Sequence, residues 1–268
     1  SLYDSKSGER GIFNRESANK QADKNGRRTV EGHEFGTNPC SEIILRSREF
    51  CNLSEVVVRA SDTPKSLLEK VRLATILGTF QSTLVNFKYV SSQWKKNCEE
   101  ERLLGVSLTG IMDCPYTNGK KSGLNKLLDE LREMAVKTNK EFAEKIGINQ
   151  SVAITCVKPS GTVSQLVDAA SGIHARHNPY YIRTVRGDKK DPLTKMMVDQ
   201  GFPVEDDAMN PSHTAVFSFP MKVDQSAIFR TDMNAIEQLE LWLTYQKHWC
   251  EHKPSVTISV KEHEWLEV

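Results

Sequence analysis

The chain lacks several features that would assign it to a specialised class of protein. No apolar run approaches the roughly 20 residues that a membrane-spanning helix needs, so we expect no membrane segment. The 36 Lys and Arg residues nearly balance the 35 Asp and Glu residues, and this balance predicts no binding surface for nucleic acid. The polar residues Ser1 to Lys6 do not resemble a secretory signal peptide.

Cysteine is also sparse, with six residues in a chain of 268. This number excludes a disulfide scaffold and indicates a reducing compartment, so we expect a cytoplasmic protein. No Cys-x-x-Cys pair and no zinc-type histidine spacing is present, and we predict no metal site. His174 and His177 are the nearest approach, but no cysteine or carboxylate lies close to them in the sequence.

The hydrophobic pattern predicts alternating helices and strands, with room for one large domain or two small ones. Expected helices cover 63–87, 92–113, 124–146, 162–168, 192–200 and 234–251, and expected strands cover 152–157, 180–185, 214–219 and 256–260. The small residues in 103–110 fit either close helix packing or a strand, and the pattern leaves both open. From residue 150 onwards the alternation favours βα units with parallel pairing.

The most informative segment is Asn38-Pro39-Cys40-Ser41-Glu42, with Cys51 eleven residues after Cys40. Proline restricts its own backbone and that of the preceding residue, and the apolar run 43–45 indicates a buried segment. We therefore expect Cys40 at the tip of a loop, near a carboxylate and a second thiol. This arrangement suits redox and acid–base chemistry, although buried cysteines often serve only as small hydrophobic residues.

A second informative segment, Pro159-Ser160-Gly161-Thr162-Val163-Ser164, lies between an expected strand and an expected helix. The free N–H groups at a helix N-terminus carry partial positive charge, and a glycine lets a ligand approach the backbone. The segment therefore fits a phosphate site. The alternative is an ordinary helix N-cap formed by Ser160 or Thr162.

Four segments together resemble the catalytic chain of ribonucleotide reductases: 7–15, 38–43, 50–53 and 158–164. The chain is most similar to the class II, adenosylcobalamin-dependent ribonucleoside-triphosphate reductases. The resemblance covers essentially all of residues 1–268. It implies an α/β fold, in which the chain is the second half of a ten-stranded α/β barrel. That half would have five parallel strands with helices and a finger loop that carries the radical cysteine.

The resemblance implies roles for residues around the first segment. Cys40 matches the cysteine that becomes a thiyl radical, and Glu42 matches the general base on the ribose 3′-hydroxyl. Asn38 matches the amide that contacts the ribose hydroxyls, and Cys51 matches a redox-active thiol. Position 41 is Ser where many relatives have Gly or Ala, and we expect little effect of this difference.

In the second segment, the resemblance implies that Ser160, Gly161 and Thr162 bind the substrate phosphates, with Ser164 a weaker candidate. His174, Arg176 and His177 could reach a phosphate or cofactor, but a surface position or the bracing of loops explains them better. The other four cysteines match no catalytic role, and Cys156 fits a core position.

The implied function is reduction of ribonucleotides, as triphosphates, to 2′-deoxyribonucleotides with adenosylcobalamin as cofactor. The implied partners are the ribonucleotide substrate, a thioredoxin or glutaredoxin-type reductant, and the N-terminal half of the barrel. That half, with the disulfide partner of Cys51, and a C-terminal cysteine tail are expected to be absent from residues 1–268. The alternatives are a class I subunit that acts on diphosphates with a separate radical-generating subunit, and a non-catalytic nucleotide-binding half-barrel.

Overall fold

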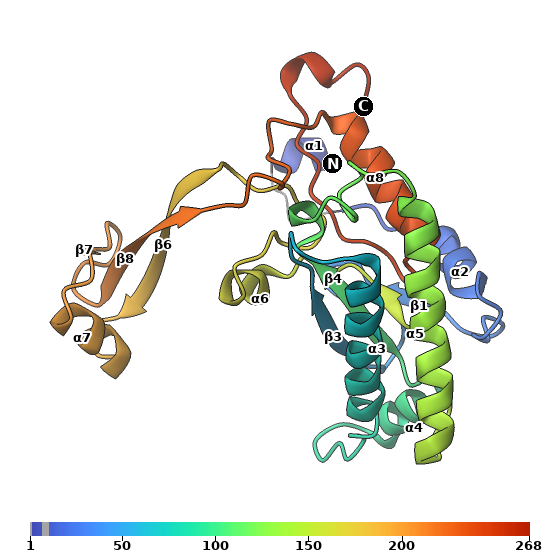
Figure 1. Ribbon diagram of the computed structural model, residues 1–268. Coiled ribbons are helices and arrows are strands. Elements are labelled where there is room, and N and C mark those ends of the chain that lie inside the picture. Colours follow the sequence, from blue (N-terminus) through green and yellow to red (C-terminus); the bar gives the residue numbers. More distant parts are fainter. Residues whose placement is uncertain (1, 7–10) are drawn as a thin grey trace.

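The computed structural model describes residues 2–6 and 11–268. Its body is built on three parallel strands, β3 (Asn52–Val57), β4 (Leu104–Thr109) and β5 (Thr155–Cys156), which lie side by side in this order. Helices α3 (Pro64–Gln81) and α5 (Leu124–Ile146) pack against each other beside this sheet (Figure 1). The central strand β4 is buried along its whole length, and its apolar side chains belong to the main core.

Local sequence signals explain where the two long helices begin and end. Thr63 caps α3 by accepting a hydrogen bond from the backbone N–H of Ser66, and Pro64 occupies the first helical position. Helix α5 buries a leucine-rich face and ends at Gly147, whose φ of 73° lies in the left-handed region that glycine tolerates. The predicted helix 124–146 is thus confirmed residue for residue, while α3 ends six residues before the predicted position 87.

A short antiparallel hairpin, β1 (Phe35–Thr37) and β2 (Ile44–Arg46), follows helix α2 (Arg15–Asp23). Phe35 and Ile44 pack with Ala22 of α2 in a small separate core. The hairpin turn therefore projects from a base that is held by its own buried apolar contacts.

The remaining helices of the body are α1 (Leu2–Ser5), α4 (Ser92–Glu101), α6 (Gly161–Leu166) and α8 (Ala235–His248), with two short 3-10 helices at Ile111–Asp113 and Glu262–Glu264. The sequence left residues 103–110 open between a helix and a strand. The structure shows the strand β4 there, and α4 ends before it. Helix α8 packs against α5. The chain that follows α8 returns to the sheet, where Pro254 forms a parallel β-bridge with Val157. The predicted strand 256–260 is wrong, because this segment forms no strand.

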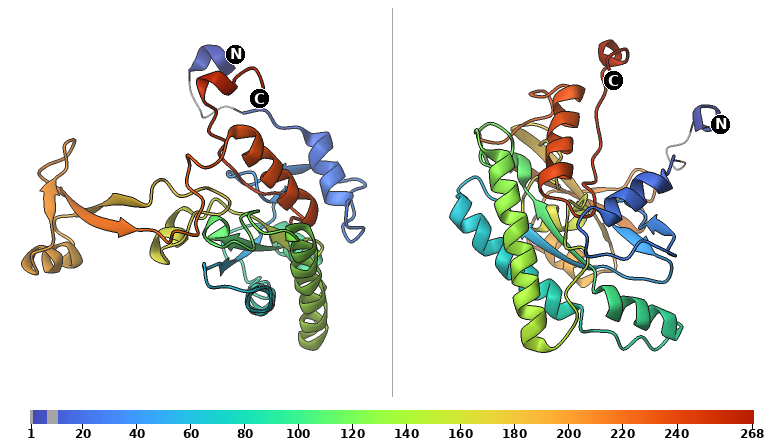
Figure 2. Two further views of the ribbon diagram at one scale, coloured as in Figure 1. Left: turned by 45° about the horizontal axis from the view of Figure 1, so that its top comes forward. Right: turned by 90° about the vertical axis from the view of Figure 1, so that its right-hand side faces the viewer.

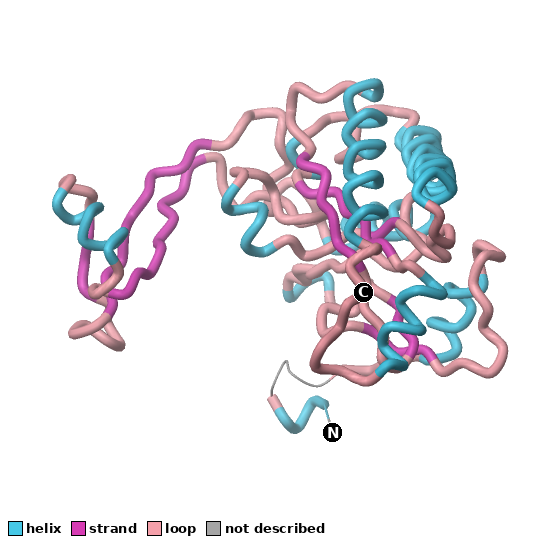
Figure 3. Tube along the Cα trace, turned by 90° about the horizontal axis from the view of Figure 1, so that it is seen from below, coloured by secondary structure: helices cyan, strands magenta, loops and turns pink. Residues whose placement is uncertain are grey.

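An arm projects away from the body (Figures 1 and 2). It consists of β6 (Tyr180–Asp188), α7 (Pro192–Asp199), β7 (Val204–Asp206) and β8 (Thr214–Lys222), with sheet order β6-β8-β7. Figure 3 shows the two long strands reaching outwards, with α7 at the far end. The predicted parallel βα pairing after residue 150 is wrong here, because β6 and β8 pair antiparallel over nine residues each and α7 lies inside their connection.

The described residues thus contain a mixed α/β body with three parallel strands, where the resemblance implies five. Residues 7–10 of the first quoted segment lie outside the described residues. Within the ranges 2–6 and 11–268, no helix has both the length and the apolar character needed to cross a bilayer.

Candidate active site

The hairpin turn presents Cys40 to solvent while the residues on either side anchor it. Asn38 Oδ1 accepts a hydrogen bond from the backbone N–H of Ile43 at 3.0 Å, and the Ser41 N–H donates to the Asn38 carbonyl at 2.9 Å. Ile43 is fully buried, whereas Cys40 is exposed. Ser41 has a φ of 62°, in the left-handed region that disfavours residues with a Cβ. The turn is therefore tight, and it holds the thiol outwards.

Glu42 points inwards and is fully buried. Its Oε1 accepts hydrogen bonds from Asn38 Nδ2 at 2.8 Å and from Lys158 Nζ at 3.1 Å. Within residues 2–6 and 11–268, its Oε2 is buried and has no hydrogen-bond partner. A buried carboxylate oxygen without a donor is costly, and such an atom is expected where a ligand completes the site.

Lys158 comes from the end of β5, more than a hundred residues after the hairpin. Its backbone N–H donates to Ser107 Oγ on β4 at 2.9 Å, which fixes where its side chain begins. Partial burial opposes the charged form, but the hydrogen bond and charge of Glu42 outweigh it and raise the pKa of Lys158. Lys158 therefore carries its positive charge beside Glu42 at neutral pH.

Cys51 is a free, half-buried thiol just before β3. Gly105 on β4 makes room for it, since a Cβ added there would lie 3.2 Å from Cys51 Sγ. Burial, and then the negative charges of Glu49 and Glu42, raise the pKa of the Cys51 thiol. Cys51 is therefore held as a protonated thiol, able to give up a hydrogen.

The other cysteines are all free and buried. Burial is the main cause of a raised pKa in each of them, so they are inert thiols: Cys98, Cys114, Cys156 and Cys250. Their burial agrees with the core role predicted for Cys156, and none of the four forms a disulfide with Cys51.

The second segment surrounds the start of the short helix α6. Ser160 precedes the helix with a φ of 51°, and its side chain makes no capping hydrogen bond. Gly161 and Thr162 are exposed, whereas Ser164 is fully buried and donates from its hydroxyl to the Gly161 carbonyl at 3.0 Å. The structure thus leaves Gly161 and Thr162 open to a ligand and uses Ser164 within the helix. A capping role for the Ser160 side chain is not observed.

Sequence reasoning missed Glu55, a half-buried carboxylate on β3. Burial raises its pKa, against the opposing effects of the neighbouring Ser160 hydroxyl and Lys158 ammonium. Glu55 therefore lies close to the second segment, 158–164. A carboxylate directly before the apolar pair Val56 and Val57 was the available signal, since such residues are seldom buried without a partner.

His252 was also missed, and it ties the hairpin to the sheet. Its Nδ1 accepts the backbone N–H of Ile44 at 3.3 Å, and its Nε2 lies 3.0 Å from the Leu104 carbonyl, to which it donates. Both ring nitrogens of a neutral imidazole are thus used. Complete burial, followed by the charge of Arg28, lowers the pKa of His252 to about 3. The next residue continues this contact, since the Lys253 N–H donates to the Glu42 carbonyl.

A buried ionic cluster holds the base of the hairpin. Arg28 contacts Glu101 at 2.6 Å and Glu49 at 3.3 Å, and it also donates to the Ile44 carbonyl on β2. Arg46 contacts the same two carboxylates from the hairpin itself. Burial and the neighbouring Glu101 raise the pKa of Glu49. This cluster orients the hairpin relative to α4.

Arg176 and His174 brace loops. This was the alternative to contact with a phosphate or cofactor. Arg176 forms two hydrogen bonds with Asp113, at 2.9 and 3.0 Å, and a third with Asp168. His174 Nε2 accepts the backbone N–H of Thr257 at 3.0 Å. These contacts engage both side chains within the protein.

A cavity of about 630 Å³ lies against the hairpin turn. Thr37 and Ser41 form one part of its wall, and the described end of the first quoted segment forms another, through Gly11, Ile12, Phe13 and Asn14. The cavity therefore brings residues 11–14 and Ser41 together, although they are separate in sequence.

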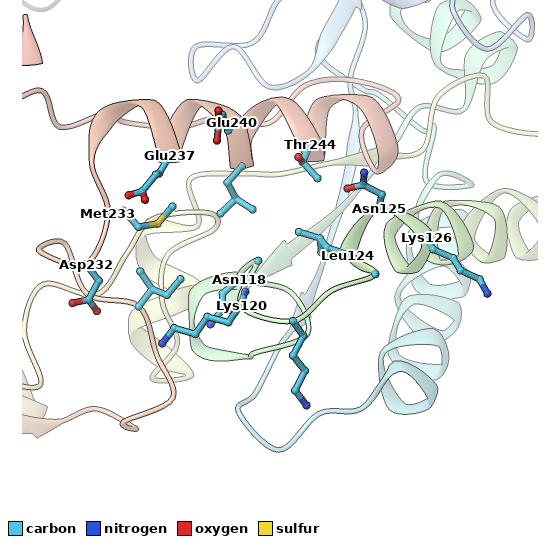
Figure 4. A pocket seen from close by; sticks show the side chains of 15 residues that line it. Asn118, Lys120, Leu124, Asn125, Lys126, Asp232, Met233, Glu237, Glu240 and Thr244 are labelled. Atoms are coloured by element: carbon cyan, nitrogen blue, oxygen red, sulfur yellow. Dashed lines mark hydrogen bonds between the residues drawn. The ribbon is translucent and has the colours of Figure 1, made fainter. Parts of the chain in front are cut away.

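A second pocket, of about 710 Å³, lies between α8 and the loop that leads into α5 (Figure 4). Two of its charged groups have partners within the protein: Lys120 donates to the carbonyls of Ser226 and Ala227, and Glu237 caps α8 with Asn234. None of the site residues predicted from the sequence lines it. We therefore place the candidate active site at the hairpin and not in this larger pocket.

Comparisons with known proteins show what the chain is similar to. No family model matches the chain. An adenosylcobalamin-dependent ribonucleoside-triphosphate reductase from Lactobacillus gasseri is 30% identical over 96% of the chain, and one from Euglena gracilis is 30% identical over 84%. The chain spans 38% and 30% of the length of these two relatives.

Solved structures show the same relationship. The crystal structure of a B-12 dependent (class II) ribonucleotide reductase matches 87% of the chain with a TM-score of 0.73 and 26% identity, and the chain covers 36% of it. The class Id ribonucleotide reductase alpha subunit of Actinobacillus ureae matches 95% of the chain with a TM-score of 0.56 and 15% identity, a likeness of fold alone. By sequence and by fold, this chain is a relative of the adenosylcobalamin-dependent ribonucleoside-triphosphate reductases.

Proposed function

We propose that the chain takes part in reducing ribonucleoside triphosphates to 2′-deoxyribonucleotides. One observation carries the proposal: the exposed Cys40 thiol lies two residues from a buried carboxylate whose Oε2 has no partner among the described residues. The relatives that match most of the chain are named as enzymes of this activity. A radical thiol and a carboxylate on one tight turn can address neighbouring atoms of the same ribose.

Each residue then has a defined task. Cys40, as a thiyl radical, takes the 3′-hydrogen and later returns it, and Glu42 Oε2 accepts the 3′-hydroxyl proton. Asn38 holds Glu42 and faces the ribose hydroxyls. The 2′-hydroxyl leaves as water, while Cys51 and a second thiol each lose a hydrogen and join in a disulfide. The raised pKa of Cys51 suits this task, because the protonated thiol is the species that carries the hydrogen.

Adenosylcobalamin would supply the radical that converts the Cys40 thiol to a thiyl. The residues present fit this use in one respect: Cys40 is exposed at the turn, so a bulky cofactor can approach its sulfur. In this proposal Cys40 is the residue that meets the cofactor, and the Asn38–Glu42 contact keeps the turn in place during the approach.

The substrate phosphates would bind at the start of α6, through Thr162 and the backbone at Gly161 and Ser160. Gly161 is exposed, with no atom within 4 Å of the position a Cβ would take, so a phosphate can approach its backbone closely. Lys158, on the same segment, adds a positive charge nearby. We do not assign phosphate contact to the buried Ser164.

We propose further that residues 1–268 form the second half of the family's ten-stranded barrel, with the hairpin turn as its finger loop. The other half would supply the thiol partner of Cys51. A thioredoxin or glutaredoxin-type protein would reduce the resulting disulfide. A cytoplasmic setting suits this chemistry, because all six cysteines are free thiols.

The first experiment replaces Cys40 with Ser in the complete reductase that contains residues 1–268. We expect formation of deoxyribonucleoside triphosphate to fall to background, while substrate binding, measured by equilibrium dialysis with labelled nucleotide, changes little. Normal turnover by Cys40→Ser would contradict the radical role and favour a chain that only binds nucleotides.

A second experiment decides the class of radical generation, since the fold is shared with a class Id subunit. Titration of the complete reductase with adenosylcobalamin should change the cobalamin absorbance saturably and start turnover. If the protein leaves the spectrum unchanged and instead needs a separate subunit and diphosphate substrates, the class II assignment is wrong.

A further inference from the structure

Two donors converge on one oxygen of Glu42. Asn38 Nδ2 lies 2.8 Å from Oε1, and Lys158 Nζ lies 3.1 Å from the same atom. The other oxygen, Oε2, is buried and has no partner among the described residues. The two oxygens of this carboxylate therefore have different environments, one saturated and the other free.

We propose that Lys158 is a positioning residue that directs Glu42 to act through Oε2, an inference that rests on the proposed ribonucleotide reduction. A carboxylate held only by Asn38 can rotate about its terminal bond and exchange its two oxygens. The second donor removes this freedom, because both hydrogen bonds must break before Oε1 can turn towards the substrate. Lys158 thereby keeps the free oxygen aimed at the ribose hydroxyl.

The placement of Lys158 supports this role. Its backbone is fixed by the hydrogen bond to Ser107, and its side chain is only 28% exposed, so the ammonium is not a mobile surface group. The contact joins the end of β5 to the hairpin across 116 residues of sequence. A charge-assisted hydrogen bond of this kind is stronger than a neutral one and is less screened when partly buried.

Lys158 also keeps the buried site electrically balanced. The titratable groups that interact with Lys158 or with Glu42 come from several elements: Cys40 on the turn, Cys51 before β3, Glu55 on β3, Cys156 on β5 and Lys253 after α8. Lys158 is the cation hydrogen-bonded to the Glu42 carboxylate. Without it, a fully buried carboxylate would keep one amide donor, which makes the charged form expensive.

The test compares three variants of the complete reductase. Lys158→Met removes the charge and keeps similar length, and Lys158→Arg keeps the charge. Lys70→Met is the matched control, because Lys70 on α3 forms an ion pair of similar exposure with Asp62, which precedes that helix. We expect Lys158→Met to lower kcat about 10-fold or more with KM changed less than about 3-fold, Lys158→Arg to recover most of the loss, and Lys70→Met to keep normal kcat.

The split between kcat and KM separates positioning from a merely structural effect. In Lys158→Met the Glu42 carboxylate can turn, so kcat should fall while KM stays near its wild-type value. A structural defect would weaken substrate binding and lower kcat together. An active enzyme whose kcat is unchanged by Lys158→Met would overturn the positioning role.

Two further measurements keep the result interpretable. If Lys158→Met does not fold, Lys158→Gln replaces it as the uncharged variant, and a loss of kcat in Lys158→Gln that Lys158→Arg does not share supports a requirement for charge. In the 268-residue chain, the NMR signal of the Asn38 side-chain amide should shift on Lys158→Met and not on Lys70→Met. Absence of reductase activity before any substitution would overturn the proposed function instead, irrespective of the NMR result.

Discussion

The backbone N–H of Ile44 donates a hydrogen bond to Nδ1 of His252, which lies 208 residues further along the chain, at a distance of 3.3 Å. His252 also contacts the Leu104 carbonyl on β4, so one buried imidazole joins the hairpin to the central strand of the sheet. The position of Cys40 and Glu42 relative to the sheet depends on this link.

The His252 link should make stability depend on pH. Its pKa is about 3 in the folded protein and near 6.5 when unfolded, so the unfolded state takes up a proton first as pH falls. The contribution of neutral His252 is therefore intact above pH 6.5 and is lost progressively towards pH 3. Between pH 7 and pH 4.5 we expect a loss of about 2 to 3 kcal/mol in the free energy of unfolding.

Urea denaturation at a series of pH values measures this effect. His252→Gln should be less stable than wild type at pH 7, and the gap should narrow as the pH falls to 4.5. The exposed His213→Gln is the control and should track wild type at every pH. A gap between His252→Gln and wild type that stays constant across this range would contradict the assignment.

Asn38→Ala should destabilise the hairpin. The substitution removes the acceptor for the buried Ile43 N–H and one of the two donors to Glu42 Oε1. We expect a loss of about 1 to 3 kcal/mol, because buried polar groups are left unpaired. Asn38→Asp keeps the acceptor but sets a second carboxylate against Glu42, so its stability should improve at low pH. Thermal unfolding at pH 7 and pH 5 distinguishes the two variants.

Gly105→Ala should disturb the pocket of Cys51. The added Cβ would lie 2.5 Å from Leu53 Cδ2 and 3.2 Å from Cys51 Sγ, so the thiol and its neighbour must shift. Overpacking of this kind costs about 1 to 3 kcal/mol. Gly36→Ala is the matched control, because its Cβ would meet no atom within 4 Å.

Chemical denaturation measures the loss of stability in Gly105→Ala, and the rate of Cys51 alkylation measures the disturbance of the thiol. Leu53→Ala in the same chain should restore part of the stability by removing the nearest contact. Equal stability of Gly105→Ala and Gly36→Ala would show that the pocket is looser than the structure indicates.

Ser41→Gly should stabilise the turn, whereas the sequence alone suggested little effect of the residue at position 41. Ser41 has a φ of 62°, and a Cβ in this region costs about 1 to 2 kcal/mol, part of which the greater freedom of glycine in the unfolded chain offsets. We expect a net gain of up to about 1 kcal/mol. Ser41→Val should lower the melting temperature, and a lower value for Ser41→Gly would contradict the prediction.

The local elements of this protein are readable from short stretches of sequence. Helix α5 follows from its leucine spacing and from Gly147, and the turn at Asn38 to Glu42 follows from Pro39 and the buried run after it. These signals act within a few residues, through backbone sterics, helix periodicity and capping. The residue types of the site are also recognisable, because a thiol and a carboxylate at this spacing resemble those of a known family.

Longer-range arrangements were not predictable in this way. The alternation of strands and helices after residue 150 suggested parallel units, yet β6 and β8 form an antiparallel arm, because pairing depends on which edges meet in space. The burial of Ser164 in α6 and its hydrogen bond to the Gly161 carbonyl were not predictable from the sequence either. The free Oε2 of Glu42 depends on donors from two separate segments.

The sequence by itself determined helix α5, the turn and the chemical identity of the thiols and carboxylate, since these follow from local sterics and residue type. Only the tertiary structure decided that Lys158 meets Glu42, that Gly105 makes room for Cys51 and that His252 holds the hairpin. Those contacts join residues far apart in the chain, and they exist because the packing of sheet and hairpin brings their side chains within hydrogen-bonding or van der Waals distance.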